Sequence, residues 1–161
     1  MIERDIGTAA KRLLALCRKR HWMVATAESC PGGLVVAALT EIAGSSDVVD
    51  RGFVTYSNAA KQSMLGVTSA TLKKFGAVSR ETAEAMAAGA LANSDADLAV
   101  AITGIAGPGG GTEQKPVGLV YIALAGEEGT QVVERNFPGD RKRIRQFATQ
   151  QALEMIRRAL L

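Results

Sequence analysis

A serine stands at the tip of a predicted strand-to-helix turn, in the segment Ala27-Glu28-Ser29-Cys30-Pro31-Gly32-Gly33. Hydrolases with a serine nucleophile place it on such a turn, because the hydroxyl then stands clear of the sheet. The first N–H groups of the following helix could stabilise an oxyanion or bind a phosphate there, and Pro31 suits the first helical position. The pattern equally fits an ordinary helix N-cap, where serine is strongly favoured. Both roles are open for Ser29.

A lysine is the candidate base for this serine. Lys61 falls in the first turn of a predicted helix that Ser57 or Asn58 can cap. The helix dipole disfavours a positive side chain there, and the dipole together with partial burial would lower the pKa of the amine. A neutral amine can take a proton from a serine hydroxyl. The alternatives are a solvated lysine on an exposed turn, and a Tyr56 that either relays a proton or only fills the strand end.

The single histidine is excluded as that base by distance. His21 lies eight residues before Ser29, near the start of the same predicted strand. At about 3.3 Å per residue the two side chains would be about 25 Å apart. A Ser-His-Asp triad within one chain is therefore ruled out, and a serine hydrolase would need the lysine variant of that arrangement.

A glycine-dense segment follows another predicted strand. Five glycines fall between Gly104 and Gly111, directly after Thr103. Glycine lets the backbone approach a ligand closely, although the spacing matches neither a Walker loop nor a dinucleotide fingerprint. A ligand contact and a flexible connection explain this segment equally well.

Four cations gather at the predicted start of the last helix, namely Arg141, Lys142, Arg143 and Arg145. Positive charge is unfavourable at a helix N-terminus unless an anion compensates it. Arg141 is the best placed of the four to hold a phosphate, with Asp140 as the cap. A solvated basic turn is the alternative.

Hydrophobic periodicity predicts how the chain positions these segments. Predicted helices cover 2–20, 31–42, 58–65, 69–75, 80–93 and 141–160, with Pro31-Gly32-Gly33 opening the second and Ser79 capping the fifth. Predicted strands cover 22–27, 48–55, 98–102, 117–125 and 130–137. Helices separate the first three strands, whereas a tight turn joins the last two. This order favours one domain over residues 1–161, a three-layer α/β/α fold with a mixed, mostly parallel five-stranded sheet, whose ligands bind beyond the carboxyl ends of the strands.

Composition narrows the classes of function. The chain has 47% hydrophobic and 22% charged residues, which suits a globular protein, and no apolar run long enough for a membrane span. We therefore expect a cytoplasmic protein. Two cysteines and one histidine in no ligand spacing argue against a structural zinc site, and we expect no metal or cofactor. A net charge of +3 and few aromatics argue against a nucleic-acid partner.

Four separated motifs resemble the competence/damage-inducible CinA C-terminal domain family in its stand-alone form. They are A-E-S-C-x-G-G, G-F-V-T-Y-S-N-x-x-K, T-G-I-A-G-P-G-G-G and F-P-G-D-R, in the family's order over nearly the whole chain. The resemblance implies a nicotinamide-nucleotide amidohydrolase of pyridine-nucleotide salvage, which converts nicotinamide mononucleotide to nicotinate mononucleotide and ammonia. The other hypothesis is a non-catalytic nucleotide-binding or regulatory module linked to competence or DNA damage. We expect a small nucleotide and further copies of the chain as partners.

The resemblance also assigns residues to roles. It implies a catalytic Ser29 and Lys61, with Tyr56 beside them. The residues expected to contact substrate are Glu28, Cys30, Gly32, Gly33, Asn58, Thr103, Gly104 and Arg141. The family usually has a threonine where this chain has Pro31, which removes a hydroxyl and an N–H next to the nucleophile.

Overall fold

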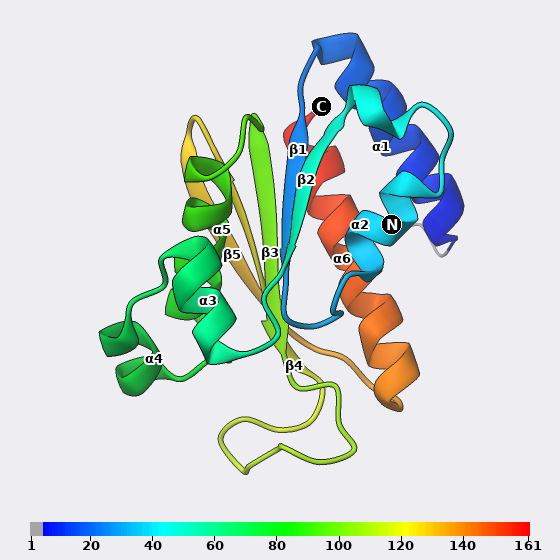
Figure 1. The fold of residues 1–161 in the computed structure, drawn as a ribbon. Helices are drawn as coiled ribbons and strands as arrows, with labels where there is room; N and C mark the ends of the chain where they lie inside the picture. The colour runs from blue at the N-terminus through cyan, green and yellow to red at the C-terminus, as the bar shows by residue number, and fades with distance from the viewer. Residues whose placement is uncertain (1–4) are drawn as a thin grey trace.

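The computed structural model describes residues 5–161, which form a five-stranded mixed sheet covered by helices on both faces (Figure 1). The strands lie in the order β2-β1-β3-β4-β5. They are β1 Val24–Glu28, β2 Val49–Val54, β3 Leu98–Gly104, β4 Leu119–Gly126 and β5 Gly129–Asn136. Strand β1 pairs in parallel with β2 and β3, whereas β4 pairs antiparallel with β3 and β5. The predicted α/β/α fold is confirmed. The description "mostly parallel" holds for the direction of the strands, because only β4 runs opposite to the others, but two of the four strand pairs are antiparallel.

The helices divide between the two faces of this sheet. Figure 1 shows α1, α2 and α6 on one face and α3, α4 and α5 on the other. Their bounds are α1 Ile6–Arg20, α2 Leu34–Thr40, α3 Asn58–Leu65, α4 Ser69–Phe75, α5 Arg80–Ala92 and α6 Arg141–Ala159. None of the helices in this part of the chain has the length and apolar character that a membrane span needs.

Strand β3 shows why the two faces differ. Its larger side chains, Leu98, Val100 and Ile102, belong to the core under α1 and α6, whereas Ala99 and Ala101 belong to the core under α5. The alternation follows from the two-residue period of a strand. Small side chains on the second face let α5 approach closely, and the core there is built mainly from alanine.

One local prediction was wrong, and one short element was missed. Helix α2 begins at Leu34 with Gly33 as its N-cap, so Pro31 is not its first residue. A 3₁₀ helix, Ser45–Asp47, precedes β2 and was not predicted. The predicted start of the first helix at Ile2 lies outside the described residues. The bounds predicted for α3 and α4 are confirmed.

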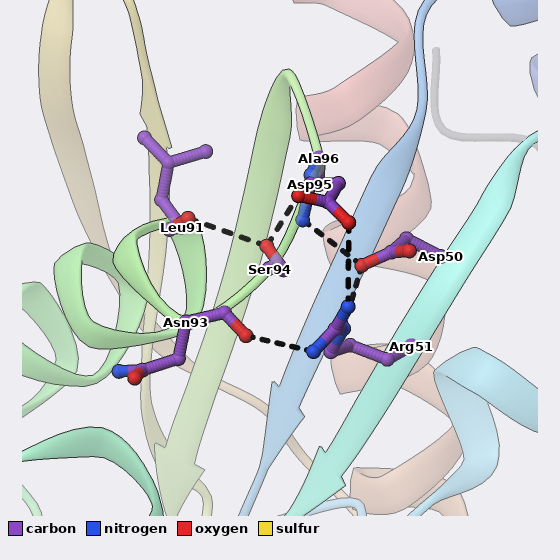
Figure 2. A network of polar contacts seen from close by, with 7 residues as sticks. All are labelled: Asp50, Arg51, Leu91, Asn93, Ser94, Asp95 and Ala96. Carbon is purple, nitrogen blue, oxygen red and sulfur yellow. Dashed lines mark hydrogen bonds and ion pairs between the residues drawn. The ribbon is translucent and has the colours of Figure 1, made fainter.

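A polar network ties the start of edge strand β2 to the connection between α5 and β3 (Figure 2). The Asp50 carboxylate accepts hydrogen bonds from Arg51 Nε at 2.6 Å and from the N–H of Asp95 at 3.1 Å. Arg51 Nη1 also donates to the carbonyl of Asn93 at 3.1 Å. The network is exposed and lies near the amino ends of the parallel strands. It therefore anchors the edge strand β2 and lies away from the carboxyl ends of the strands.

Candidate active site

A cavity of about 580 Å³ opens at the carboxyl ends of β1, β2 and β3. This is the edge of a parallel sheet where ligands usually bind. The residues that line it are Ser29, Cys30, Pro31, Gly32, Val54, Tyr56, Asn58, Lys61, Ala77, Val78, Thr103, Gly104, Ala106, Arg141 and Arg145. The ends of β1 and β2 therefore bring the predicted serine and lysine to one cavity, and the start of the last helix, α6, brings Arg141 to it.

Ser29 and Lys61 meet directly in this cavity. The Lys61 Nζ lies 3.0 Å from the Ser29 Oγ, although the residues are 32 apart in sequence. Only 1% of Lys61 is exposed, and burial lowers the pKa of its amine. A buried amine that loses its proton more easily is a better base than a surface lysine. A solvated Lys61 is therefore excluded.

The start of α3 places Lys61 at this point. Ser57 is the N-cap, and its hydroxyl accepts a hydrogen bond from the N–H of Ala60 at 3.0 Å. Asn58 is the first helical residue and Lys61 the fourth, one turn along, so both side chains can reach the cavity. The cap sets where α3 begins, and so fixes which residue faces Ser29.

Three oxygen atoms surround the amine of Lys61. Besides Ser29, Lys61 Nζ lies 3.0 Å from the carbonyl oxygen of Thr55 and 3.4 Å from that of Tyr56. A neutral amine has two N–H groups and one lone pair. Carbonyl oxygens can only accept. A charged amine would donate to all three oxygens, whereas in the neutral form the two N–H groups can bond the carbonyls and leave the lone pair for the Ser29 hydroxyl proton. The two carbonyls thus orient the base, as a carboxylate orients a catalytic histidine.

Glu28 holds the helix that follows Ser29. Its carboxylate accepts from the N–H groups of Gly33, Val35 and Val36 at 3.1, 2.9 and 3.1 Å, and from the Thr26 hydroxyl at 3.3 Å. The residue is fully buried, and burial raises the pKa of its carboxyl against the opposing effect of those hydrogen bonds. The N–H groups of Gly33, Val35 and Val36 therefore donate to Glu28 and are not free to face Ser29, contrary to the expectation.

The same arrangement changes three other expectations. Gly33 is the N-cap of α2, so Ser29 is not a helix cap. Neither Glu28 nor Gly33 belongs to the cavity lining, whereas Cys30 and Gly32 do. Glu28 and Gly33 therefore shape the turn that presents Ser29, and their predicted contact with substrate finds no support in this placement.

Cys30 is the neighbouring alternative nucleophile. Burial raises the pKa of its thiol to about 11, although the nearby Arg145 and Arg141 act in the opposite direction. The thiolate is the nucleophilic form of cysteine, and little of it is present near neutral pH at such a pKa. The hydroxyl next to Lys61 is the better candidate.

Two arginines of α6 form one wall. Arg141 Nη1 donates to the Gly107 carbonyl at 2.9 Å, and its Nη2 lies 3.4 Å from the Tyr56 hydroxyl. Arg145, one turn further along, donates to the Pro31 carbonyl through Nε at 3.1 Å and Nη2 at 2.8 Å. Arg145 was not among the predicted site residues, although its spacing of four from Arg141 could have indicated it.

The remaining predicted residues, Tyr56, Thr103 and Gly104, also line the cavity. Tyr56 is 68% exposed, and its hydroxyl contacts Arg141, so a proton-relay role for it stays a prediction. The buried Thr103 hydroxyl donates to the Ala77 carbonyl at 2.7 Å. A Cβ at Gly104 would lie 2.9 Å from the Leu119 carbonyl oxygen, so packing against β4 already requires glycine there.

An apolar part of the lining was not predicted. Val54, Ala77, Val78 and Ala106 line the cavity beside the polar groups, and Ala77 and Val78 come from the connection between α4 and α5. Within residues 5–161 no three His, Cys, Asp or Glu side chains gather as a metal site would need.

Comparisons with known proteins identify the relatives of this chain. The model of the CinA C-terminal domain family matches residues 7–160. Nicotinamide-nucleotide amidohydrolase PncC from Enterobacter agglomerans is 47% identical over 146 residues, which cover 90% of this chain and 89% of that protein. A putative competence-damage inducible protein from Caldicellulosiruptor bescii is 48% identical over 149 residues, and the match spans 92% of this chain but 36% of that relative.

A solved structure extends the likeness to the fold. The crystal structure of competence/damage inducible protein CihA from Agrobacterium tumefaciens superimposes with a TM-score of 0.94 at 53% identity, over 99% of this chain and 98% of that one. Family match, sequence identity and fold agree. The chain belongs to the CinA C-terminal domain family.

Proposed function

We propose that this chain is an amidohydrolase that releases ammonia from the carboxamide of a nicotinamide nucleotide, with Ser29 as nucleophile and Lys61 as base. The observation that carries the proposal is the 3.0 Å contact between the Ser29 hydroxyl and a buried Lys61 amine. A nicotinamide nucleotide is suggested by the name of the Enterobacter agglomerans relative, and the family resemblance implies nicotinamide mononucleotide in particular. The product is nicotinate mononucleotide.

The first half of the reaction forms an acyl-enzyme. Neutral Lys61 takes the hydroxyl proton while Ser29 Oγ bonds to the carboxamide carbon, and the carbonyl oxygen becomes an oxyanion. The oxyanion then reforms the C=O bond as the C–N bond breaks. The protonated Lys61 returns its proton to the departing nitrogen, which leaves as ammonia.

The second half regenerates the enzyme. Lys61, neutral again, takes a proton from a water molecule that attacks the ester carbon. The ester bond to Ser29 breaks, and its oxygen recovers the proton from Lys61. The nicotinate carboxylic acid is released and ionises. Over the two halves one water molecule is consumed for each amide bond broken. The products, a carboxylic acid and ammonia, account for all atoms and electrons.

The cavity suits a phosphorylated ligand of this size. Its volume of about 580 Å³ lies within the usual range for small-molecule sites. Arg141 at the mouth offers a charge-assisted contact to a phosphate, while Val54, Val78 and Ala106 offer apolar surface to a pyridine ring. A role in pyridine-nucleotide salvage, a cytoplasmic location and a homo-oligomeric state stay predictions.

Ammonia release from nicotinamide mononucleotide tests the proposal. Wild type should release ammonia, Ser29→Ala should release none while still binding the nucleotide, and Cys30→Ala should stay active because its thiol is protonated. Binding without release by the wild type would instead favour a non-catalytic nucleotide-binding module. A dead Cys30→Ala with an active Ser29→Ala would reassign the nucleophile.

A further inference from the structure

The peptide between Pro31 and Gly32 is held by an arginine from the far end of the chain. Arg145 donates to the Pro31 carbonyl through two nitrogens, Nε at 3.1 Å and Nη2 at 2.8 Å. The two residues are 114 apart in sequence, and both line the cavity with Ser29. Two donors from one planar guanidinium fix the direction of this carbonyl more tightly than one would.

The turn after Ser29 offers few N–H groups to an oxyanion. The N–H of Ser29 donates to the Ile102 carbonyl, and at the start of α2 those of Gly33, Val35 and Val36 donate to Glu28. Pro31 has no N–H. The N–H groups of Cys30 and Gly32 are left without an acceptor among residues 5–161, and both residues line the cavity. One of these two donors, that of Gly32, shares its peptide with the carbonyl that Arg145 holds.

The planar peptide links the carbonyl's direction to that of the N–H. In a trans peptide the C=O and N–H point in opposite directions. The Pro31 carbonyl points towards Arg145 on α6, which lies on one face of the sheet, whereas Lys61 comes from α3 on the other (Figure 1). The Gly32 N–H therefore points away from the Arg145 guanidinium, at a residue that lines the same cavity as Ser29 and Lys61.

We propose that Arg145 is a positioning residue, which holds the Pro31–Gly32 peptide so that the Gly32 N–H donates to the oxyanion formed when Ser29 attacks. The guanidinium also polarises this peptide, because a charged donor on the carbonyl strengthens the hydrogen bond made by the N–H of the same amide. The inference rests on the proposed function and adds the residue that organises stabilisation of the oxyanion.

Arg141 provides the contrast within the same wall. Its guanidinium bonds the glycine-rich loop and the rim residue Tyr56, and neither contact involves the turn that carries Ser29. Arg141 should therefore act on substrate binding, and Arg145 on the rate of the chemical step.

Steady-state kinetics of Arg145→Ala and Arg145→Lys separate these roles. Removing an oxyanion donor costs about 10²–10³ in kcat, so a displaced one should cost at least about tenfold. We expect that loss for Arg145→Ala with nicotinamide mononucleotide and with its phosphate-free nucleoside alike, with KM changed less than about threefold and an unchanged pH profile. Arg145→Lys, which keeps one donor, should recover part of the rate. Arg143→Ala, which removes an exposed arginine of the same helix, is the matched control.

Two results would overturn the inference. If Arg145→Ala raised KM for the nucleotide but not for the nucleoside, with kcat unchanged, Arg145 would be a phosphate-binding residue. Equal kcat values for Arg145→Ala and Arg143→Ala would show that Arg145 is not required to position the Pro31–Gly32 peptide.

A measurement on the free protein separates this inference from the proposed function. If the wild type releases no ammonia, the proposed function fails, but the Gly32 amide resonance can still be followed by NMR. Arg145→Ala should shift that resonance, because the carbonyl of the same peptide loses its charged donor, while Arg143→Ala should leave it in place. An unchanged Gly32 amide in Arg145→Ala refutes the positioning role.

Discussion

Replacing Glu28 with glutamine tests how the turn of the nucleophile is held. One carboxylate oxygen accepts from the N–H groups of Gly33 and Val35, and the other from the N–H of Val36 and the Thr26 hydroxyl. The glutamine oxygen can keep the first pair. Its NH₂ group then faces the Val36 N–H, donor against donor, whereas the Thr26 hydroxyl can rotate to accept. One buried backbone N–H thus loses its acceptor.

The expected cost follows from that count. A buried donor left without an acceptor costs about 1–3 kcal/mol. Helix α2 buries Val35 and Leu39 in the core, so the cost should appear in global unfolding. With a urea dependence of about 1–3 kcal/mol per molar, a loss of about 2 kcal/mol lowers the urea midpoint by about 1 M. Glu128→Gln, the same change on an exposed turn, should leave the midpoint unchanged.

The pH dependence of the difference sharpens this test. Burial raises the pKa of Glu28 in the folded protein, so its stabilising contribution is complete below the unfolded pKa and declines as pH rises through the folded pKa. Glutamine does not titrate. The urea midpoint of the wild type should therefore exceed that of Glu28→Gln by more at pH 4 than at pH 8. Equal midpoints at both pH values, or a gap that widens with pH, would refute the reasoning.

Three further predictions concern separate parts of the molecule. Arg141→Ala should weaken binding of the nucleotide about 10–100-fold and barely affect the nucleoside, by calorimetry; equal losses would contradict a phosphate contact. Gly89→Ala should lower Tm severely or prevent folding, because the added Cβ would lie 1.9 Å from the Leu65 carbonyl oxygen; a Tm near wild type would show that α5 can shift. The pKa of Glu154 is lowered to about 2, chiefly by Arg157, so this residue should contribute about 2 kcal/mol above pH 5 and lose that contribution as pH falls through about 2. The stability gap to Glu154→Gln should therefore close on acidification, and a constant gap would refute this.

Much of the fold could be predicted because its signals are local. Helices α3 and α4 have their predicted bounds, since Ser57 and Thr68 cap them through hydroxyls only a few residues from the N–H groups they satisfy. The alternation of β3 likewise follows from neighbouring residues. The meeting of Ser29 and Lys61 was predictable because each follows a parallel strand, and parallel strands end at one edge.

What could not be predicted depends on contacts between distant segments. The Arg145 bond to Pro31 spans 114 residues, and nothing near either residue indicates it. The start of α2 was predicted too early because proline is favoured at a first helical position. In the structure the buried Glu28 carboxylate bonds the N–H groups of Gly33, Val35 and Val36, and the helix begins there instead. The pattern of a strand ending in glutamate is no different from that of an exposed acidic turn until burial is known.

The pH–rate profile of wild type and Lys61→Arg, measured as ammonia release from nicotinamide mononucleotide, tests the central claim most directly. Burial lowers the pKa of Lys61, and the deprotonated amine is the active form, so the wild-type rate should rise with pH through that lowered pKa. Arginine keeps its proton at any working pH, so Lys61→Arg should be nearly as inactive as Lys61→Ala. A Lys61→Arg enzyme with near-normal turnover and an unchanged pH profile would contradict a serine–lysine dyad.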